Sequence, residues 1–215
     1  MGSYEDPAAL RRSFEGAGQV LLVSTNDPHA DAAALHAASP DSLFAAAPGH
    51  AATEQLLAGS GAAWTAPRNG FYAHRLAWLL GPWRETGMIA APADGPVSWT
   101  DRADAAEVAA VILAAGQPFD GPVTLTTRRA VTFEDIAACA SDVTGRAVKR
   151  VVVEDEQWVA SKVQDGTPEP MARMLLGFFR AARAQRFAEV SPALAERLGR
   201  EPRSVTDQIA DTNAA

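Results

Sequence analysis

Residues 56–72 read LLAGSGAAWTAPRNGFY and contain the end of a helix, a strand and a turn in close succession. The Gly59-Ser60-Gly61 segment ends the predicted helix, since glycine is the residue that most often follows a helix. The apolar run Ala62–Pro67 predicts a strand. Asn69-Gly70 is a turn signal, because both residues tolerate the backbone angles that turns need. A helix followed directly by a strand is typical of layered α/β proteins.

The segments on both sides repeat this alternation of helix and strand. Val20–Val23 is a short, continuous apolar run of the kind that forms a buried parallel strand. Strands are also predicted over Val123–Leu125 and Val148–Val153, and helices over Ala103–Ala114 and from Thr132 to Gly145. We therefore predict an α/β fold, with a reduced parallel sheet flanked by helices, in a single domain.

The last third of the chain is predicted to be helical. Helices are expected around Trp158 and over Met171–Arg186, Pro192–Leu198 and Val205–Ala210, where they would form a small C-terminal lobe. The arginines of the second of these helices form the one basic cluster of the sequence, and we interpret them as a solvated helix face.

The composition excludes several classes of protein. The 215 residues carry a net charge of −7, and this balance argues against a nucleic-acid partner. No apolar run approaches the roughly 20 residues of a membrane span, and no signal pattern opens the sequence. The single cysteine, Cys139, can form no internal disulfide, as is usual in a reducing compartment. We therefore expect a cytoplasmic protein that contacts neither nucleic acid nor membrane.

Five segments resemble landmarks of the NmrA-like family of atypical short-chain dehydrogenases, and they occur in the family's order. Residues 56–72 resemble the point where a helix ends, the sixth strand begins and an Arg-Asn-Gly-aromatic turn follows, most closely in the type 2 NAD(P)H:quinone oxidoreductases. The other four are Tyr4–Leu10, Thr100–Ala105, Gly121–Leu125 and Leu198–Val205.

The resemblance implies a truncated Rossmann-like domain of the NmrA type. Its sheet core would comprise residues 1–70 and 96–127, and a substrate-side lobe would comprise residues 71–95 and 128–215.

The sequence departs from the family pattern where the cofactor would bind. Family members begin with a strand and a glycine-rich turn that holds the dinucleotide pyrophosphate. No G-x-G-x-x-G pattern occurs here, and Gly16-Ala17-Gly18 precedes a strand, so we interpret it as a helix end. Residues 26–52 are fewer than the family's helix, strand and loop at that place. We therefore predict that no cofactor binds, with NADPH as the alternative.

A further departure concerns the catalytic pair of the wider superfamily, a tyrosine with a lysine four residues later. The tyrosines of this sequence are Tyr4 and Tyr72, and neither has lysine at that offset. This excludes the classical chemistry without excluding the family.

His50 and Glu54 are candidates for acid–base catalysis. They lie four residues apart on a predicted helix and so share a face. A carboxylate beside an imidazole would raise the imidazole pKa and form a proton-transfer pair. The alternative is an ordinary surface hydrogen bond. No third ligand lies at metal-site spacing, so we predict no metal.

The turn after Ala62–Pro67 is the best candidate for a ligand site. Ligands of open α/β sheets bind at the carboxyl ends of strands, so we predict that Asn69, Phe71 and His74 bind substrate. The phenol of Tyr72 could polarise a carbonyl group. The resemblance implies that Asn69 and Phe71 lie near the nicotinamide and substrate of the quinone oxidoreductases. The alternative is a turn with packed aromatic rings.

Trp78 and Trp83 follow this turn and are predicted to extend a hydrophobic substrate pocket. Large apolar side chains of this kind more often belong to the core, which is the alternative for both.

The leading hypothesis is a cofactor-independent enzyme that uses Tyr72, His50 and Glu54. It would catalyse an isomerisation, cyclisation or dehydration of a small hydrophobic metabolite that bears a carbonyl group. The first alternative is an NAD(P)H-dependent quinone or enone oxidoreductase. The second is a non-catalytic module that senses a ligand or binds a partner.

The strand Val20–Val23 leads to a prediction about oligomeric state. In the family, the first strand of the sheet covers this edge, and uncovered edges invite pairing. We expect a homodimer, or another partner, to cover it. Size-exclusion chromatography with light scattering at micromolar concentration should give twice the chain mass, whereas a stable monomer would contradict the prediction.

Overall fold

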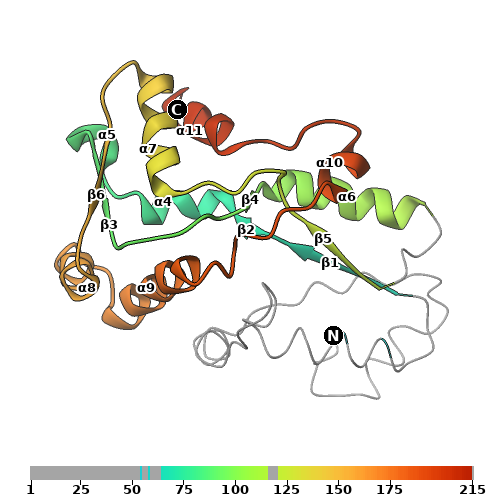
Figure 1. Cartoon of the computed structure of the whole chain (residues 1–215), viewed down its shortest axis with the longest axis horizontal. Helices are drawn as coiled ribbons and strands as arrows, with labels where there is room; N and C mark the ends of the chain where they lie inside the picture. Colours follow the sequence, from blue (N-terminus) through green and yellow to red (C-terminus); the bar gives the residue numbers. More distant parts are fainter. Residues whose placement is uncertain (1–53, 55–57, 59–63, 116–120, 215) are drawn as a thin grey trace, which may run out of the picture.

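The computed structural model describes residues 54, 58, 64–115 and 121–214 (Figure 1). The predictions for Val20–Val23, His50 and the short region 26–52 lie outside these residues. The described strands are β1 (Thr65–Asn69), β2 (Phe71–Tyr72), β3 (Met88–Ala91), β4 (Trp99–Thr100), β5 (Gly121–Leu125) and β6 (Lys149–Val152). The described helices that follow β2 are η1 (Ala73–Arg75), α4 (Leu76–Leu79), α5 (Trp83–Thr86), α6 (Arg102–Ala114), α7 (Phe133–Thr144), α8 (Asp155–Gln164), α9 (Glu169–Arg183), α10 (Ala193–Leu198) and α11 (Val205–Ala214).

The described strands form parallel pairs, which confirms the predicted α/β class. β1 pairs with β5, β2 with β4, and β3 with β6. Helices flank these pairs: α10 packs on α6 and β5, and α11 packs on α7. In Figure 1, α7 and α11 lie on one side of the central strands, and α8 and α9 lie on the other.

Residues 65–72 form one extended segment that pairs with β5 over its first part and with β4 over its last two residues. Gly70, between the two parts, is buried, and its N–H donates to the Leu125 carbonyl at 3.1 Å. A Cβ at this position would lie 2.5 Å from Thr100 Oγ1 and 2.6 Å from the Ser98 carbonyl oxygen. The turn predicted at Asn69-Gly70 is therefore a close packing contact within an extended segment.

An aromatic cluster forms the centre of the core. Phe71 meets Trp99 edge to face with 5.6 Å between ring centroids, and Phe178 stacks on Phe187 at 5.5 Å. Phe133 and Phe179 extend the cluster toward Trp158. Contacts of this kind add to the hydrophobic gain of burial. The cluster joins β2, β4, α7, α8 and α9, so it holds the C-terminal helices against the strands.

Side chains cap the starts of two helices. The Asp101 carboxylate accepts hydrogen bonds from the Ala103 and Asp104 N–H groups and caps α6. Thr132 and Asp135 form a capping box at the start of α7, and the bonds from Thr132 lower the pKa of Asp135. Gly145 ends α7 in the left-handed conformation, as predicted.

A buried arginine organises the β3–β6 pair. The side chain of Arg150 is 3% exposed and donates to the carbonyl oxygens of Ala91 and Pro92 and to the Asp94 carboxylate. The other oxygen of Asp94 accepts from the Phe133 N–H at 2.7 Å. Because a buried charge is costly unless paired, this network fixes the loop after β3 against the start of α7.

The structure differs from the sequence-based expectation after Tyr72. The aromatic-rich sequence of Ala73–Trp83 predicts a single helix, but the segment consists of η1 and α4 and then the first residue of α5. Gly81 has a positive φ and precedes Pro82, and both residues interrupt a helix. The predicted strand Ala62–Pro67 lies slightly later, as β1. The division into sheet core and substrate-side lobe stays a prediction.

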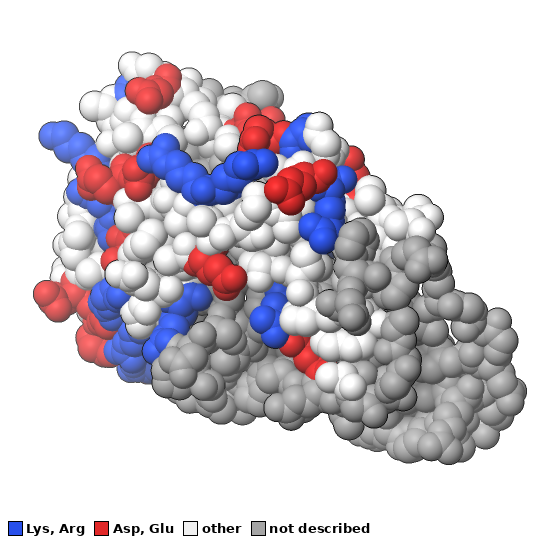
Figure 2. All heavy atoms as spheres, turned by 45° about the vertical axis from the view of Figure 1, so that its right-hand side comes forward, with Lys and Arg blue, Asp and Glu red and all other residues white. Residues whose placement is uncertain are grey.

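The arginines of α9 are ion-paired at the surface. Arg180 and Arg183 bind Asp155, and Arg173 binds Glu156 and Glu169. Figure 2 shows basic and acidic side chains beside one another over the face that it presents. Within the described residues, no helix has the length and apolarity that crossing a membrane requires.

The packing of Gly70 gives a test of the fold. Gly70→Ala should lower the free energy of unfolding by about 1–3 kcal/mol, because the new methyl group overlaps Thr100 and the Ser98 carbonyl. Gly177→Ala in α9 is the matched control: a Cβ there meets nothing within 4 Å, and alanine favours a helix. Urea denaturation measures both, and equal stability of the two variants would contradict the close approach.

Candidate functional site

The candidate site lies where β1 and β2 reach their carboxyl ends. Asn69 ends β1 opposite Leu125 of β5, and Tyr72 ends β2 opposite Thr100 of β4. The chain then turns into η1, which carries His74. The structure thus brings three of the predicted site residues, Asn69, Tyr72 and His74, to the edge where ligands of parallel sheets bind.

Asn69 orients the phenol of Tyr72. The Asn69 Nδ2 group donates to the Tyr72 hydroxyl oxygen at 3.2 Å. With its oxygen accepting this bond, the hydroxyl is left to donate its own proton elsewhere. Asn69 Oδ1 and Thr126 Oγ1 are buried without a hydrogen-bond partner among the described residues. Buried polar atoms are normally paired, so these two retain bonding capacity at the ends of β1 and β5.

His74 adjoins this phenol and is held in its neutral form. The Tyr72 and His74 rings lie 5.7 Å apart between centroids. The pKa of His74 is lowered, first because surrounding atoms exclude water from part of the ring, and then because Arg75 and Arg102 are positively charged. Asp101 acts in the opposite direction. A neutral imidazole at pH 7 can both accept and donate a proton.

Arg75 and Arg102 bring two positive charges near His74. Arg102, the first residue of α6, is exposed and has no ion-pair or hydrogen-bond partner among the described residues. Arg75 lies 4.4 Å over the Trp78 ring. The sequence pattern did not single out either residue, and Arg102 directly follows Asp101, which caps α6. The signal that could have identified Arg102 is its place directly after a strand end and a helix-capping aspartate.

Glu54 is held by Arg68 in a two-point ion pair, with N–O distances of 2.9 and 2.5 Å. The hydrogen bond with Glu54 raises the pKa of Arg68. The structure therefore connects Glu54 to β1. Its predicted partner His50 lies outside the described residues, so the acid–base pair stays a prediction.

The three aromatic residues predicted to bind substrate occupy different environments. Phe71 packs into the aromatic core against Trp99, Phe178 and Phe187. Trp83 is 4% exposed, whereas Trp78 is 49% exposed. Of the three, Trp78 is the one that presents its ring to solvent.

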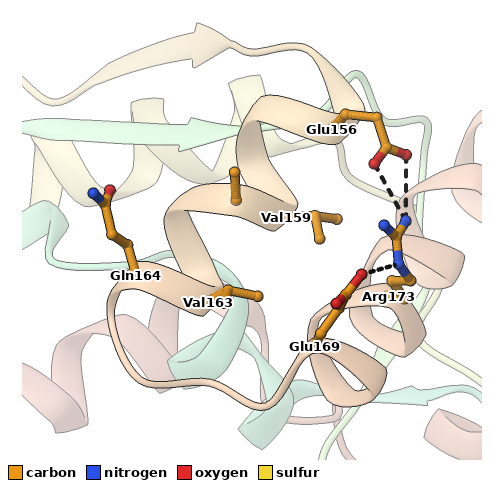
Figure 3. A pocket seen from close by; sticks show the side chains of 7 residues that line it. Glu156, Val159, Val163, Gln164, Glu169 and Arg173 are labelled. Carbon is orange, nitrogen blue, oxygen red and sulfur yellow. Dashed lines mark hydrogen bonds and ion pairs between the residues drawn. The ribbon is translucent and has the colours of Figure 1, made fainter.

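A concavity lies between α8 and α9, away from the predicted residues (Figure 3). Val159 and Val163 form its floor, and the paired Glu156, Glu169 and Arg173 form its rim. It is open to solvent, and the charged groups on its rim already bind one another. No cluster of metal-ligating side chains occurs in the described part of the chain.

The chain is similar to proteins of one family. It is 31% identical over 194 residues to quinone oxidoreductase 2 of Escherichia coli, covering 80% of this chain and 67% of that protein. It is 23% identical over 235 residues to the NmrA-like family domain-containing oxidoreductase flvB of Aspergillus flavus, covering 96% of this chain and 76% of the relative. No known family profile matches.

A solved structure agrees with these relatives. The structure of the NADPH-dependent quinone oxidoreductase QOR2 from E. coli, complexed with NADPH, superposes with a TM-score of 0.80 at 25% identity, covering 99% of this chain and 82% of that one. The fold is thus that of a Rossmann-like atypical short-chain dehydrogenase. The chain belongs to the NmrA-like family, which confirms the resemblance drawn from its sequence.

The environment of His74 gives a prediction about pH. Because its pKa is lowered, the imidazole should titrate below the range of a histidine in a short peptide, and Arg102→Gln should raise the midpoint by removing a nearby positive charge. NMR of the imidazole protons, assigned with His74→Gln, measures both. Arg128→Gln, at an exposed arginine that pairs with Glu201, is the control. If Arg102→Gln leaves the His74 titration midpoint unchanged, the charge of Arg102 does not act on His74, and the prediction is contradicted.

Proposed function

We propose that the chain takes part in NAD(P)H-dependent reduction of a small quinone or enone. The observation that carries the proposal is the Tyr72 phenol, which Asn69 orients at the carboxyl end of β2 beside a neutral His74. Support comes from the family, whose relatives are named as oxidoreductases, one of them an NADPH-dependent quinone oxidoreductase.

The described residues fit one part of such a cofactor. Asn69 Oδ1 is a buried acceptor without a described partner, and amide groups of this kind suit a carboxamide such as that of nicotinamide. Arg75 and Arg102 supply positive charge for phosphate groups.

When bound, NAD(P)H supplies a hydride to the substrate. The chain's own residues supply the proton. Asn69 keeps the Tyr72 oxygen in place, so the phenol would donate its proton to the carbonyl oxygen of the substrate. One hydride and one proton together add two hydrogens, which convert a quinone to its hydroquinone or reduce an enone. The neutral His74 can then return a proton from solvent to the phenolate.

This proposal takes the place of the cofactor-independent hypothesis. That hypothesis rested on the missing glycine-rich pattern, and no relative named above is described as an isomerase, cyclase or lyase. The redox alternative has support from both relatives and from the solved structure.

The test follows NADPH oxidation with quinone and enone acceptors in the purified chain. Tyr72→Phe should lower kcat by roughly 100-fold, the usual contribution of a positioned general acid, with the affinity for NADPH unchanged. Mass spectrometry should show a substrate that has gained two hydrogens. A product of unchanged mass, formed without NADPH, would instead support the non-redox hypothesis, and an unchanged kcat would remove Tyr72 from the mechanism.

A further inference from the structure

The first turn of α6 is held by the C-terminal segment of the chain. Asp101, which caps α6 with one carboxylate oxygen, accepts a hydrogen bond from Gln208 of α11 with the other. Three residues later, Asp104 is 1% exposed, and its oxygens accept from Arg200 Nη2 at 2.8 Å and from the Arg203 N–H at 2.6 Å. Both carboxylates are therefore tied to residues about 100 positions further along the chain.

These contacts account for the segment Leu198–Val205, which resembles a family signature and which the proposed function leaves without a role. The segment leaves α10 at Gly199, which has the left-handed conformation, and uses one arginine side chain and one backbone N–H to bind Asp104. Arg203 also pairs with Asp211 of α11. The helix that follows packs against η1, the element that carries His74.

Arg102 lies between the two anchored carboxylates. Its own guanidinium has no partner in the described part of the chain, so its position depends on the backbone of this turn. The turn is fixed through Asp101 and Asp104, and the C-terminal helix that fixes it also contacts η1. Moving the turn therefore moves Arg102 relative to His74.

We propose that Asp104 is a positioning residue that clamps the C-terminal segment onto α6 and thereby directs Arg102 toward the phosphate groups of the cofactor. The proposal rests on the proposed function for its ligand. The clamp itself is a property of this chain's residues and can be observed without a cofactor.

The experiment compares Asp104→Asn with Arg102→Ala. Asparagine keeps the size of the side chain but removes its negative charge. Its NH2 group would also face one of the two donors, Arg200 Nη2 or the Arg203 N–H, and could not accept a hydrogen bond from it. Each substitution should raise the Kd for NADPH about ten-fold, the usual worth of one charged hydrogen bond, with kcat at saturating NADPH changed less than about two-fold. In the double variant the effects should not add, because Asp104 acts through Arg102.

The second readout is the NMR titration of His74 in the free protein. The charges that face this imidazole are Arg75 on its own element and Arg102 and Asp101 on α6. Asp104→Asn should shift the titration midpoint, since Arg102 and Asp101 both lie on the turn that it releases. Asp155→Asn is the matched control, because it makes the same change at a carboxylate that also binds two arginines, on α8. It should leave both the Kd and the midpoint unchanged.

Arg200→Gln provides a milder variant if Asp104→Asn fails to fold, since it leaves the Arg203 N–H on Asp104. A loss of thermal stability with unchanged Kd and an unchanged His74 midpoint would overturn the proposal and make the clamp purely structural. Additive effects in the double variant would overturn it too. Failure of the unaltered chain to bind NADPH would count against the proposed function alone, because the His74 titration still decides whether the clamp positions this turn.

Discussion

The close approach of strands at Gly70 is the constraint on which the rest of the structure depends. At this point the extended chain stops pairing with β5 and begins to pair with β4, and the Gly70 N–H donates to the Leu125 carbonyl. The Thr100 hydroxyl donates to the same carbonyl from the other side. There is no space for a Cβ, so only glycine lets β1, β4 and β5 meet here. The two residues that follow are placed by this junction.

Phe71 and Tyr72, the two residues of β2, point in opposite directions because of strand geometry. Successive side chains of a strand point to opposite faces. Phe71 therefore enters the aromatic core, where it contacts Trp99, Phe178 and Phe187. Tyr72 points the other way, where Asn69 and His74 adjoin its phenol. The core thus holds the strand that presents the phenol, which makes the site rigid at the point where a proton would be transferred.

Carboxylates that accept backbone N–H groups tie distant parts of the chain together. Asp94 joins the loop after β3 to the start of α7, and Asp104 joins α6 to the segment before α11. Each is also paired with an arginine, Arg150 or Arg200. For the buried pair of Asp94 and Arg150, removing one partner would typically cost about 3–5 kcal/mol, because the remaining charge is left without compensation. Arg200 is 45% exposed, so water screens its pair with Asp104 and the cost there is smaller. These contacts, together with the aromatic cluster, hold the C-terminal helices in place.

The sequence by itself determined the α/β class, the family and the helix bounded by Thr132 and Gly145, since all of these depend on local patterns or ordered landmarks. The ligand site that the sequence predicts after β1 stays a prediction. It could not determine that Phe71 packs inward, that Trp83 is buried while Trp78 is exposed, or that Ala73–Trp83 breaks into short helices. Nor could it show that the charge of Arg102 acts on His74, because these residues belong to elements about 30 residues apart. Side-chain environment and long-range charge are properties of packing, so the tertiary structure alone decided them.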